Sequence, residues 1–168
     1  MHYRKIHIIG GPGSGKTYSA KRLSEKINIP RFDLDKIFWK QNTNSYGKKT
    51  PKGKRKKELN KILDLDSYIL EGVYYSWLEK SFKYSDVVFV LNNSVWLRDW
   101  RLMKRFIKRK IGIVKSKQES LNDFFNLIKW NHKYDGRNLK KALNMIKKLN
   151  ENIVFCKSNS DITDFLNI

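Results

Sequence analysis

The chain has 168 residues, is 40% hydrophobic, and carries 36 Lys and Arg against 16 Asp and Glu, a formal net charge of +20. This composition predicts one globular domain over residues 1–168 and excludes a disordered chain. The longest apolar runs, such as 87–91, are too short to span a bilayer, and the N-terminus has no signal-peptide pattern. The single cysteine, Cys156, excludes a disulfide framework and a cysteine-rich zinc site, and its apolar surroundings predict a buried thiol. We therefore expect a cytoplasmic protein.

The charge surplus fits polyanionic partners of several kinds: nucleotides, phosphorylated metabolites, nucleic acid or an anionic membrane. Charge alone does not select among them. We expect a small-molecule partner and no membrane partner, with nucleic acid kept as an alternative.

Short β-branched runs alternate with helical periods along the chain, which predicts a βαβ series around a parallel sheet. In chain order, the first predicted elements are a strand at 3–9, a Gly-rich turn, a helix at 16–27, a weak strand at 30–34 and a loop at 39–47. A helix at 52–64, a strand at 67–70, a short helix at 77–82 and a strand at 86–91 follow. The last part is predicted to hold a helix from Asn93 or Ser94 to about 110, a helix capped by Ser120, a separate helix beyond Gly136, a strand at 152–157 and a helix from Ser160. The pattern predicts a three-layer α/β fold, with about five parallel strands and helices on both faces.

Residues 10–17 read Gly-Gly-Pro-Gly-Ser-Gly-Lys-Thr, which matches the phosphate-binding loop (P-loop) pattern between a strand and a helix. Backbone amides must converge on phosphate oxygens there, so Gly10, Gly13 and Gly15 are expected to allow close approach and positive φ. The following helix directs the positive end of its dipole at the same oxygens. The predicted nucleotide-binding residues are Gly10, Gly11, Pro12, Gly13, Ser14, Gly15, Lys16, Thr17 and Tyr18.

Polar side chains around this loop predict the use of ATP and Mg²⁺. Lys16 can reach the β- and γ-phosphates, and the Thr17 hydroxyl can ligate Mg²⁺. Glu71, just after the third predicted strand, is a candidate for binding a magnesium water. Asp35 follows the second strand, where open parallel sheets bind ligands, and is a candidate for orienting an acceptor hydroxyl. For Asp33 we favour a turn or capping role.

The class of P-loop protein follows from motifs that are absent. A GTPase would carry Asn-Lys-x-Asp after a strand, whereas residues 91–94 read Leu-Asn-Asn-Ser. A motor ATPase would need an apolar run that ends in paired acids, and the sequence contains none. A small kinase needs only the loop, an acceptor pocket and a basic segment over the phosphates.

A helix with two stripes supplies that basic segment. One stripe is formed by Arg98, Arg101, Arg105 and Arg109, and the other, about half a turn away, by Trp96, Trp100, Met103 and Ile107. We expect this helix to bury its apolar stripe and to present its guanidiniums to the phosphates. Arg98, Arg101 and Arg105 are therefore predicted catalytic residues of a lid at about 98–120, with Lys16 and Asp35. Arg109 alone is expected to be solvated.

A basic run at 48–57 lies in or near a predicted acceptor-binding insertion at about 36–65, or is simply a solvated face. The same basic residues, among Trp39, Tyr46, Tyr74 and Tyr75, are also typical of sites that stack a nucleobase or a single strand.

These segments resemble the adenylate-kinase-related P-loop kinases, and specifically the bacterial group often labelled topology modulation proteins. The resemblance covers nearly the whole chain and rests on the loop at 10–17, Asp-Leu-Asp-Lys-Ile-Phe-Trp at 33–39, Leu-Glu-Gly-Val-Tyr at 70–74, Trp-Leu-Arg-Asp-Trp-Arg at 96–101 and Lys-Arg-Phe-Ile-Lys-Arg at 104–109. It implies a nucleoside-monophosphate-kinase-like fold with an acceptor insertion after the second strand and an arginine-bearing lid. It also implies ATP and Mg²⁺, with the same loop, lid and acidic residues as named above.

The chain departs from typical adenylate kinases at 71–75, where Glu-Gly-Val-Tyr-Tyr replaces Asp-Gly-Phe-Pro-Arg. The arginine that would grip AMP is missing, so AMP is not the expected acceptor. The primary hypothesis is an ATP-dependent phosphotransferase with an unidentified acceptor. The alternatives are a nucleic-acid-binding protein that uses ATP as a switch or a polynucleotide as acceptor, and a nucleotide-binding module without catalysis.

Overall fold

The computed structural model describes residues 3–40, 48–113 and 120–168. Within them, parallel strands form a five-stranded sheet in the order β2-β3-β1-β4-β5. The strands are β1 (Lys5–Gly10), β2 (Arg31–Asp33), β3 (Tyr68–Gly72), β4 (Val87–Leu91) and β5 (Ile153–Cys156). The predicted three-layer α/β fold with about five parallel strands is confirmed.

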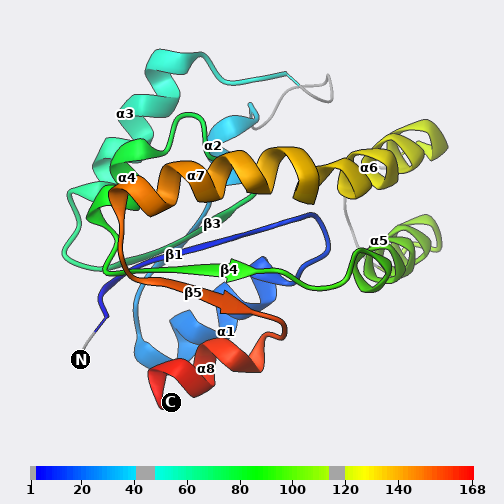
Figure 1. The fold of residues 1–168 in the computed structure, drawn as a ribbon. Helices are drawn as coiled ribbons and strands as arrows, with labels where there is room; N and C mark the ends of the chain where they lie inside the picture. Colours follow the sequence, from blue (N-terminus) through cyan, green and yellow to red (C-terminus); the bar gives the residue numbers. More distant parts are fainter. Residues whose placement is uncertain (1–2, 41–47, 114–119) are drawn as a thin grey trace.

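Helices cover both faces of the sheet (Figure 1). They are α1 (Lys16–Ile27), α2 (Leu34–Phe38), α3 (Lys52–Leu63), α4 (Glu79–Tyr84), α5 (Val95–Lys110), α6 (Leu121–Tyr134), α7 (Lys140–Leu149) and α8 (Ser160–Leu166). Helices α1 and α8 lie on one face, and α3, α4 and α7 on the other. None of the helices in the described part of the chain has the length and apolar character needed to cross a bilayer.

Alternation along the central strand β1 divides the core between the two faces. Ile6 and Ile8 pack toward α1 and α8, whereas Ile9 packs toward α3, α4 and α7. His7 shares the face of Ile9, and its Nδ1 lies 2.8 Å from the Ser81 hydroxyl of α4. Strand β4 is buried along its whole length, as expected for an interior strand of a parallel sheet. Cys156 is buried and forms no disulfide, as predicted.

The predicted break at Gly136 is wrong. Helices α6 and α7 are joined without interruption by a single π-helical turn, η1 (Asp135–Leu139), and form one long rod in Figure 1. A Cβ at Gly136 would meet nothing within 4 Å, so this glycine serves no turn or close contact. The predicted start of α6 is correct, because Ser120 and Asp123 form a capping box there.

Two element boundaries near the phosphate loop differ from the prediction. Strand β3 extends to Gly72, so Glu71 lies within the strand and does not follow it. Strand β2 ends at Asp33, whose carboxylate accepts the Asp35 amide at 2.8 Å and caps the unpredicted helix α2. The capping role favoured for Asp33 is thereby confirmed. Positions 41–47 of the predicted loop and insertion, and 114–119 of the predicted lid, lie outside the described residues.

Candidate phosphate-binding site

The segment between β1 and α1 has the backbone geometry of an anion-binding loop. Gly13 and Gly15 have φ values of 72° and 98°, which a residue with a side chain adopts only with strain. Gly10 does not share this geometry, so the expectation of positive φ there is wrong. It is needed for another reason, because a Cβ at Gly10 would lie 2.7 Å from the carbonyl oxygen of Leu91 on β4.

Lys16 is folded back onto the loop. Its Nζ donates to the Gly11 carbonyl at 2.8 Å, and the residue is only 7% exposed. Burial lowers the pKa of Lys16 to about 8, although the Glu71 carboxylate opposes that shift. An ammonium group held this way is ready to exchange one carbonyl for phosphate oxygens.

Glu71 and Thr17 meet beside the loop because β1 and β3 are neighbours. The Thr17 hydroxyl donates to the Glu71 carboxylate at 2.7 Å. Asp33 pairs in register with Glu71 across β2 and β3, which brings a second carboxylate to this edge. Burial raises the pKa of both carboxyl groups, because a desolvated site disfavours the ionised form. A cation bound here would reverse that cost.

The donor set at this edge fits Mg²⁺ shared with a nucleotide. A hydroxyl and a carboxylate oxygen are the hard ligands that Mg²⁺ prefers, and it usually takes one or two carboxylates together with substrate phosphates. Among the described residues, no three His, Cys, Asp or Glu side chains gather into a site that could hold a metal ion. Thr17 and Glu71 would therefore hold the ion only together with phosphate oxygens and water.

Asp35 lies on α2 in contact with an aromatic group. Its carboxylate accepts the Tyr74 hydroxyl at 2.5 Å, and burial and the Asp35 charge together raise the pKa of that phenol. The Tyr74 ring stacks on Phe38 with centroids 4.4 Å apart. The Arg55 guanidinium of α3 lies 4.7 Å from the Phe38 centroid and 5.6 Å from that of Trp77. Arg55 could not be singled out from the sequence, because it lies in a run of Lys and Arg that gives no sign of which cation points inward.

The arginine stripe of α5 does not lie as predicted. Arg98 is fully buried, and its guanidinium forms a bidentate ion pair with Asp135 of η1, with N–O distances of 2.8 and 2.6 Å. It stands directly behind the loop, since a Cβ at Gly11 would lie 2.5 Å from its Nη1. The apolar stripe that was expected to be buried faces solvent instead, with Trp96 74% exposed.

Of the other two predicted lid arginines, Arg101 contacts the loop and Arg105 is exposed. The Arg101 Nη1 donates to the carbonyls of Gly13 at 3.3 Å and Ser14 at 3.0 Å, so it touches the loop from outside. Arg105 lies one turn further along and is exposed. Of the three predicted lid arginines, the structure places Arg98 and Arg101 against the loop.

Comparisons with known proteins agree with the fold. Shikimate kinase from Acinetobacter baumannii, solved in complex with shikimate, is similar over 98% of this chain and 91% of that chain, with a TM-score of 0.60 and 14% identity. For shikimate kinase from Bacteroides thetaiotaomicron the coverages are 99% and 100%, the TM-score 0.62 and the identity 14%. An uncharacterized protein from Eubacterium ventriosum is similar over 98% of this chain and 96% of that chain, with a TM-score of 0.54 and 16% identity. No family model and no curated protein matches the sequence.

The chain has the P-loop kinase fold. At this identity the comparisons give the fold alone, and the roles of its residues rest on the geometry described above.

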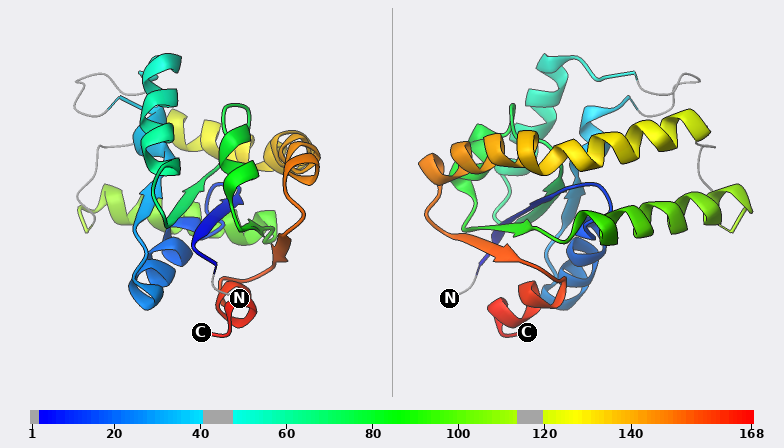
Figure 2. Two further views of the ribbon diagram at one scale, coloured as in Figure 1. Left: turned by 90° about the vertical axis from the view of Figure 1, so that its left-hand side faces the viewer. Right: turned by 45° about the vertical axis from the view of Figure 1, so that its right-hand side comes forward.

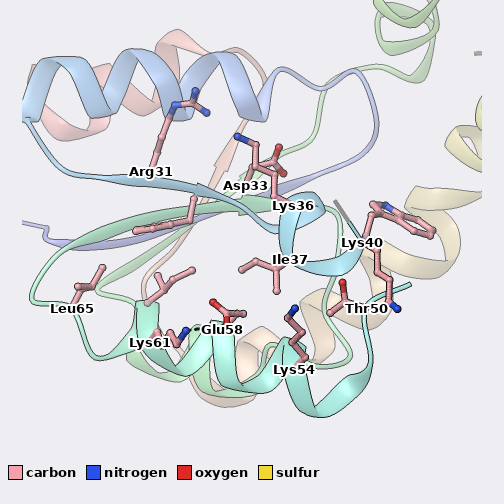
Figure 3. A pocket seen from close by; sticks show the side chains of 13 residues that line it. Arg31, Asp33, Lys36, Ile37, Lys40, Thr50, Lys54, Glu58, Lys61 and Leu65 are labelled. Atoms are coloured by element: carbon pink, nitrogen blue, oxygen red, sulfur yellow. Dashed lines mark hydrogen bonds and ion pairs between the residues drawn. The ribbon is translucent and has the colours of Figure 1, made fainter. Parts of the chain in front are cut away.

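A cavity of about 830 Å³ lies at the free edge of this P-loop kinase fold, between β2, α2 and α3 (Figure 3). It is lined by Arg31, Phe32, Asp33, Lys36, Ile37, Trp39, Lys40, Thr50, Lys54, Glu58, Lys61, Ile62 and Leu65. Five of these are cations, whereas Lys16 and Glu71 do not line it. Asp33 lies between the cavity and the phosphate loop, because it lines the cavity and also interacts electrostatically with Lys16.

One further neighbour of the loop was not foreseen. The Asn159 side chain, in the turn between β5 and α8, lies against Gly15, where a Cβ would come within 2.7 Å of its amide. The only local signal is Ser-Asn-Ser at 158–160, which is typical of any turn. Its position beside the loop follows from the pairing of β5 with β4, which no single segment indicates.

Proposed function

We propose that the chain is an ATP-dependent phosphotransferase that transfers the γ-phosphate of ATP to a small acceptor. The observation that carries this proposal is the convergence of Lys16, Thr17 and Glu71 at one edge of the sheet, with Thr17 and Glu71 2.7 Å apart. Phosphoryl transfer needs positioned positive charge and a cation ligand more than it needs covalent chemistry. This edge supplies both.

Each residue has a role that follows from its contacts. Lys16 exchanges the Gly11 carbonyl for the β- and γ-phosphates, while the loop amides enclose the same oxygens. Thr17 and, through water, Glu71 would hold Mg²⁺, which supplies neutralisation of phosphate charge when bound. Arg101 and Arg105 of the lid stabilise charge as it develops. Arg98 positions the loop from behind.

The acceptor is proposed to bind near the insertion at 36–65. Asp35 orients its hydroxyl, after giving up the Tyr74 hydroxyl. Arg55, held over the Phe38 ring, is a candidate to bind an anionic group of the acceptor. The basic rim of the cavity beside β2 favours an anionic acceptor as well. The two shikimate kinase neighbours make a hydroxy acid the first acceptor to try.

The resemblance to the topology modulation group is part of the proposal, on the motifs at 33–39 and 70–74. Tyr75 stands where adenylate kinases carry an AMP-binding arginine, so we do not propose AMP as acceptor.

The test is ADP production with a panel of hydroxy acids (shikimate included), nucleosides and nucleoside monophosphates. For the best acceptor, Lys16→Ala should lower kcat/KM about 100-fold, which corresponds to roughly 3 kcal/mol of transition-state stabilisation. The matched control is Lys21→Ala, which removes an exposed lysine of the same helix that is paired with Glu25. Unchanged activity of the Lys16 variant would remove the assignment.

The net charge of +20 supports a second candidate, a nucleic-acid-binding protein that uses ATP as a switch. It predicts tight DNA or RNA binding with a salt slope near −0.9 per neutralised phosphate on duplex DNA. Binding that vanishes at physiological salt counts against it. ATP binding without acceptor-stimulated ADP release would instead indicate a module without catalysis.

A further inference from the structure

One face of α5 exposes a continuous apolar stripe. Its members are Trp96, Trp100, Met103, Ile107 and Ile111, each 45–74% exposed. They recur at spacings of four, three, four and four residues, so they form one line along the helix. A contiguous exposed apolar surface of this kind marks an interaction site more often than a single exposed residue does.

The elements that pack on α5 contact mainly its other faces. Arg98 and Leu102 are its buried residues and face the phosphate loop, since both lie near the position of a Cβ at Gly13. Helix α6 contacts α5 through Phe106, whose ring stacks on Phe124. Figure 2 shows the two helices extending together away from the sheet. Within the described residues, the Trp96 ring meets that of His132 on α6 edge to face, with centroids 5.6 Å apart, and the rest of the stripe is 45–64% exposed.

Exposed apolar residues are also found near the far end of this helix pair. Ile113, beyond α5, and Leu121 and Phe125, on the first turns of α6, are each 57–67% exposed. Exposed apolar residues thus also lie at the end of the pair that is most distant from the sheet.

The charges beside the stripe have one sign. Helix α5 carries seven Lys and Arg and a single acid, Asp99. That acid is turned toward α6, where it accepts Asn131 at 2.8 Å and lies 2.6 Å from His132 Nε2. At about 100° per residue, Lys104 and Lys108 border the stripe on one side and Lys110 on the other; all three are exposed.

Contrary to the expectation from composition that there is no membrane partner, we propose that this surface binds an anionic phospholipid membrane, with α5 lying in the plane of the headgroups. Apolar residues that include Trp on one face, bordered by Lys, are the pattern of interfacial helices. A second copy of the chain is disfavoured, because the bordering lysines would face like charges. Nucleic acid is disfavoured, because three of the five stripe residues, Met103, Ile107 and Ile111, offer no ring for base stacking. The loop side of α5, with Arg101, is a different face, so the membrane leaves the phosphate site open.

The test is co-sedimentation of the full chain with vesicles of 70% phosphatidylcholine and 30% phosphatidylserine, and with pure phosphatidylcholine. We expect binding to the mixed vesicles at least about tenfold stronger, because both lysines and apolar residues contribute. The double variant Ile107→Ser/Ile111→Ser should lose about tenfold of that binding while its ATP affinity stays unchanged. The matched control is Phe155→Ser, an exposed apolar residue on β5.

Three results would overturn the proposal. Equal binding of the wild type to both vesicle types would show that anionic lipid is not recognised. Undiminished binding of the Ile107→Ser/Ile111→Ser variant would show that net charge alone attracts the protein. Lipid-independent dimerisation, or single-stranded oligonucleotide binding, that disappears in the same variant would assign the stripe to another partner.

Discussion

The ion pair between Arg98 and Asp135 separates two explanations of the arginines on α5. A lid arginine acts on phosphate and leaves folding unaffected, whereas a buried arginine holds α5, η1 and the loop together. The structure supports the second role for Arg98, since its side chain is fully buried and its partner is 38% exposed. The perturbation that distinguishes them is Asp135→Asn, which keeps Arg98 and removes only its counter-charge.

The expected cost follows from that burial. Removing one partner of a buried ion pair costs about 3–5 kcal/mol, because the remaining charge is left uncompensated. Water can reach the Asp135 side of this pair, so we expect about 3 kcal/mol, the lower end of that range. For a domain of 168 residues this corresponds to a fall in Tm of about 6–12 °C. Thermal unfolding followed by circular dichroism measures it.

The control is Arg101→Ala, which removes a partly exposed donor to two loop carbonyls. It should lower Tm by no more than about 3 °C, while lowering the rate of ADP formation. The reasoning is refuted if Asp135→Asn melts like the wild type and yet forms ADP about 100-fold more slowly. Arg98 would then act on substrate, as predicted from its place in the arginine stripe.

Three further predictions concern buried polar groups of the core and the site. Burial lowers the pKa of Lys16 to about 8, and bound phosphate would raise it again. ATP affinity should therefore fall above pH 8, and ATP binding should be accompanied by proton uptake. Calorimetry in two buffers of different ionisation enthalpy measures that uptake. Glu71→Gln should weaken Mg²⁺-dependent ATP binding by roughly tenfold and leave metal-free binding unchanged, as measured by fluorescence titration. Burial lowers the pKa of His7 from 6.5 to about 3, so between pH 7.5 and 4.5 only the unfolded chain takes up this proton, and the protein loses stability as the pH falls. His7→Leu should remove about 3 kcal/mol of that loss. Urea unfolding of both proteins at pH 7.5 and pH 4.5 measures the difference.

Local patterns predicted most of the sheet and the loop. The β-branched runs and the glycines at 10–15 carry enough information within single segments to locate β1, β4 and the phosphate loop. The observed ends of β2 and β3 differ from the predicted ones by one or two residues, because pairing between these strands decides where each of them stops. Arg55 and Asn159 could not be found this way, since their neighbours in space lie on distant segments.

The two stripes of α5 show the same limit more sharply. Periodicity correctly separates a guanidinium face from an apolar face, but it does not say which one meets the rest of the protein. Hydrophobicity favours burying the tryptophans, and the structure does the reverse because Asp135, 37 residues away, offers Arg98 a bidentate partner behind the loop. That partner makes a buried guanidinium tolerable, and the apolar face is left exposed as a consequence. Because the charged face of α5 turns inward in this chain, the helix presents two separate surfaces, and the exposed apolar face needs its own explanation.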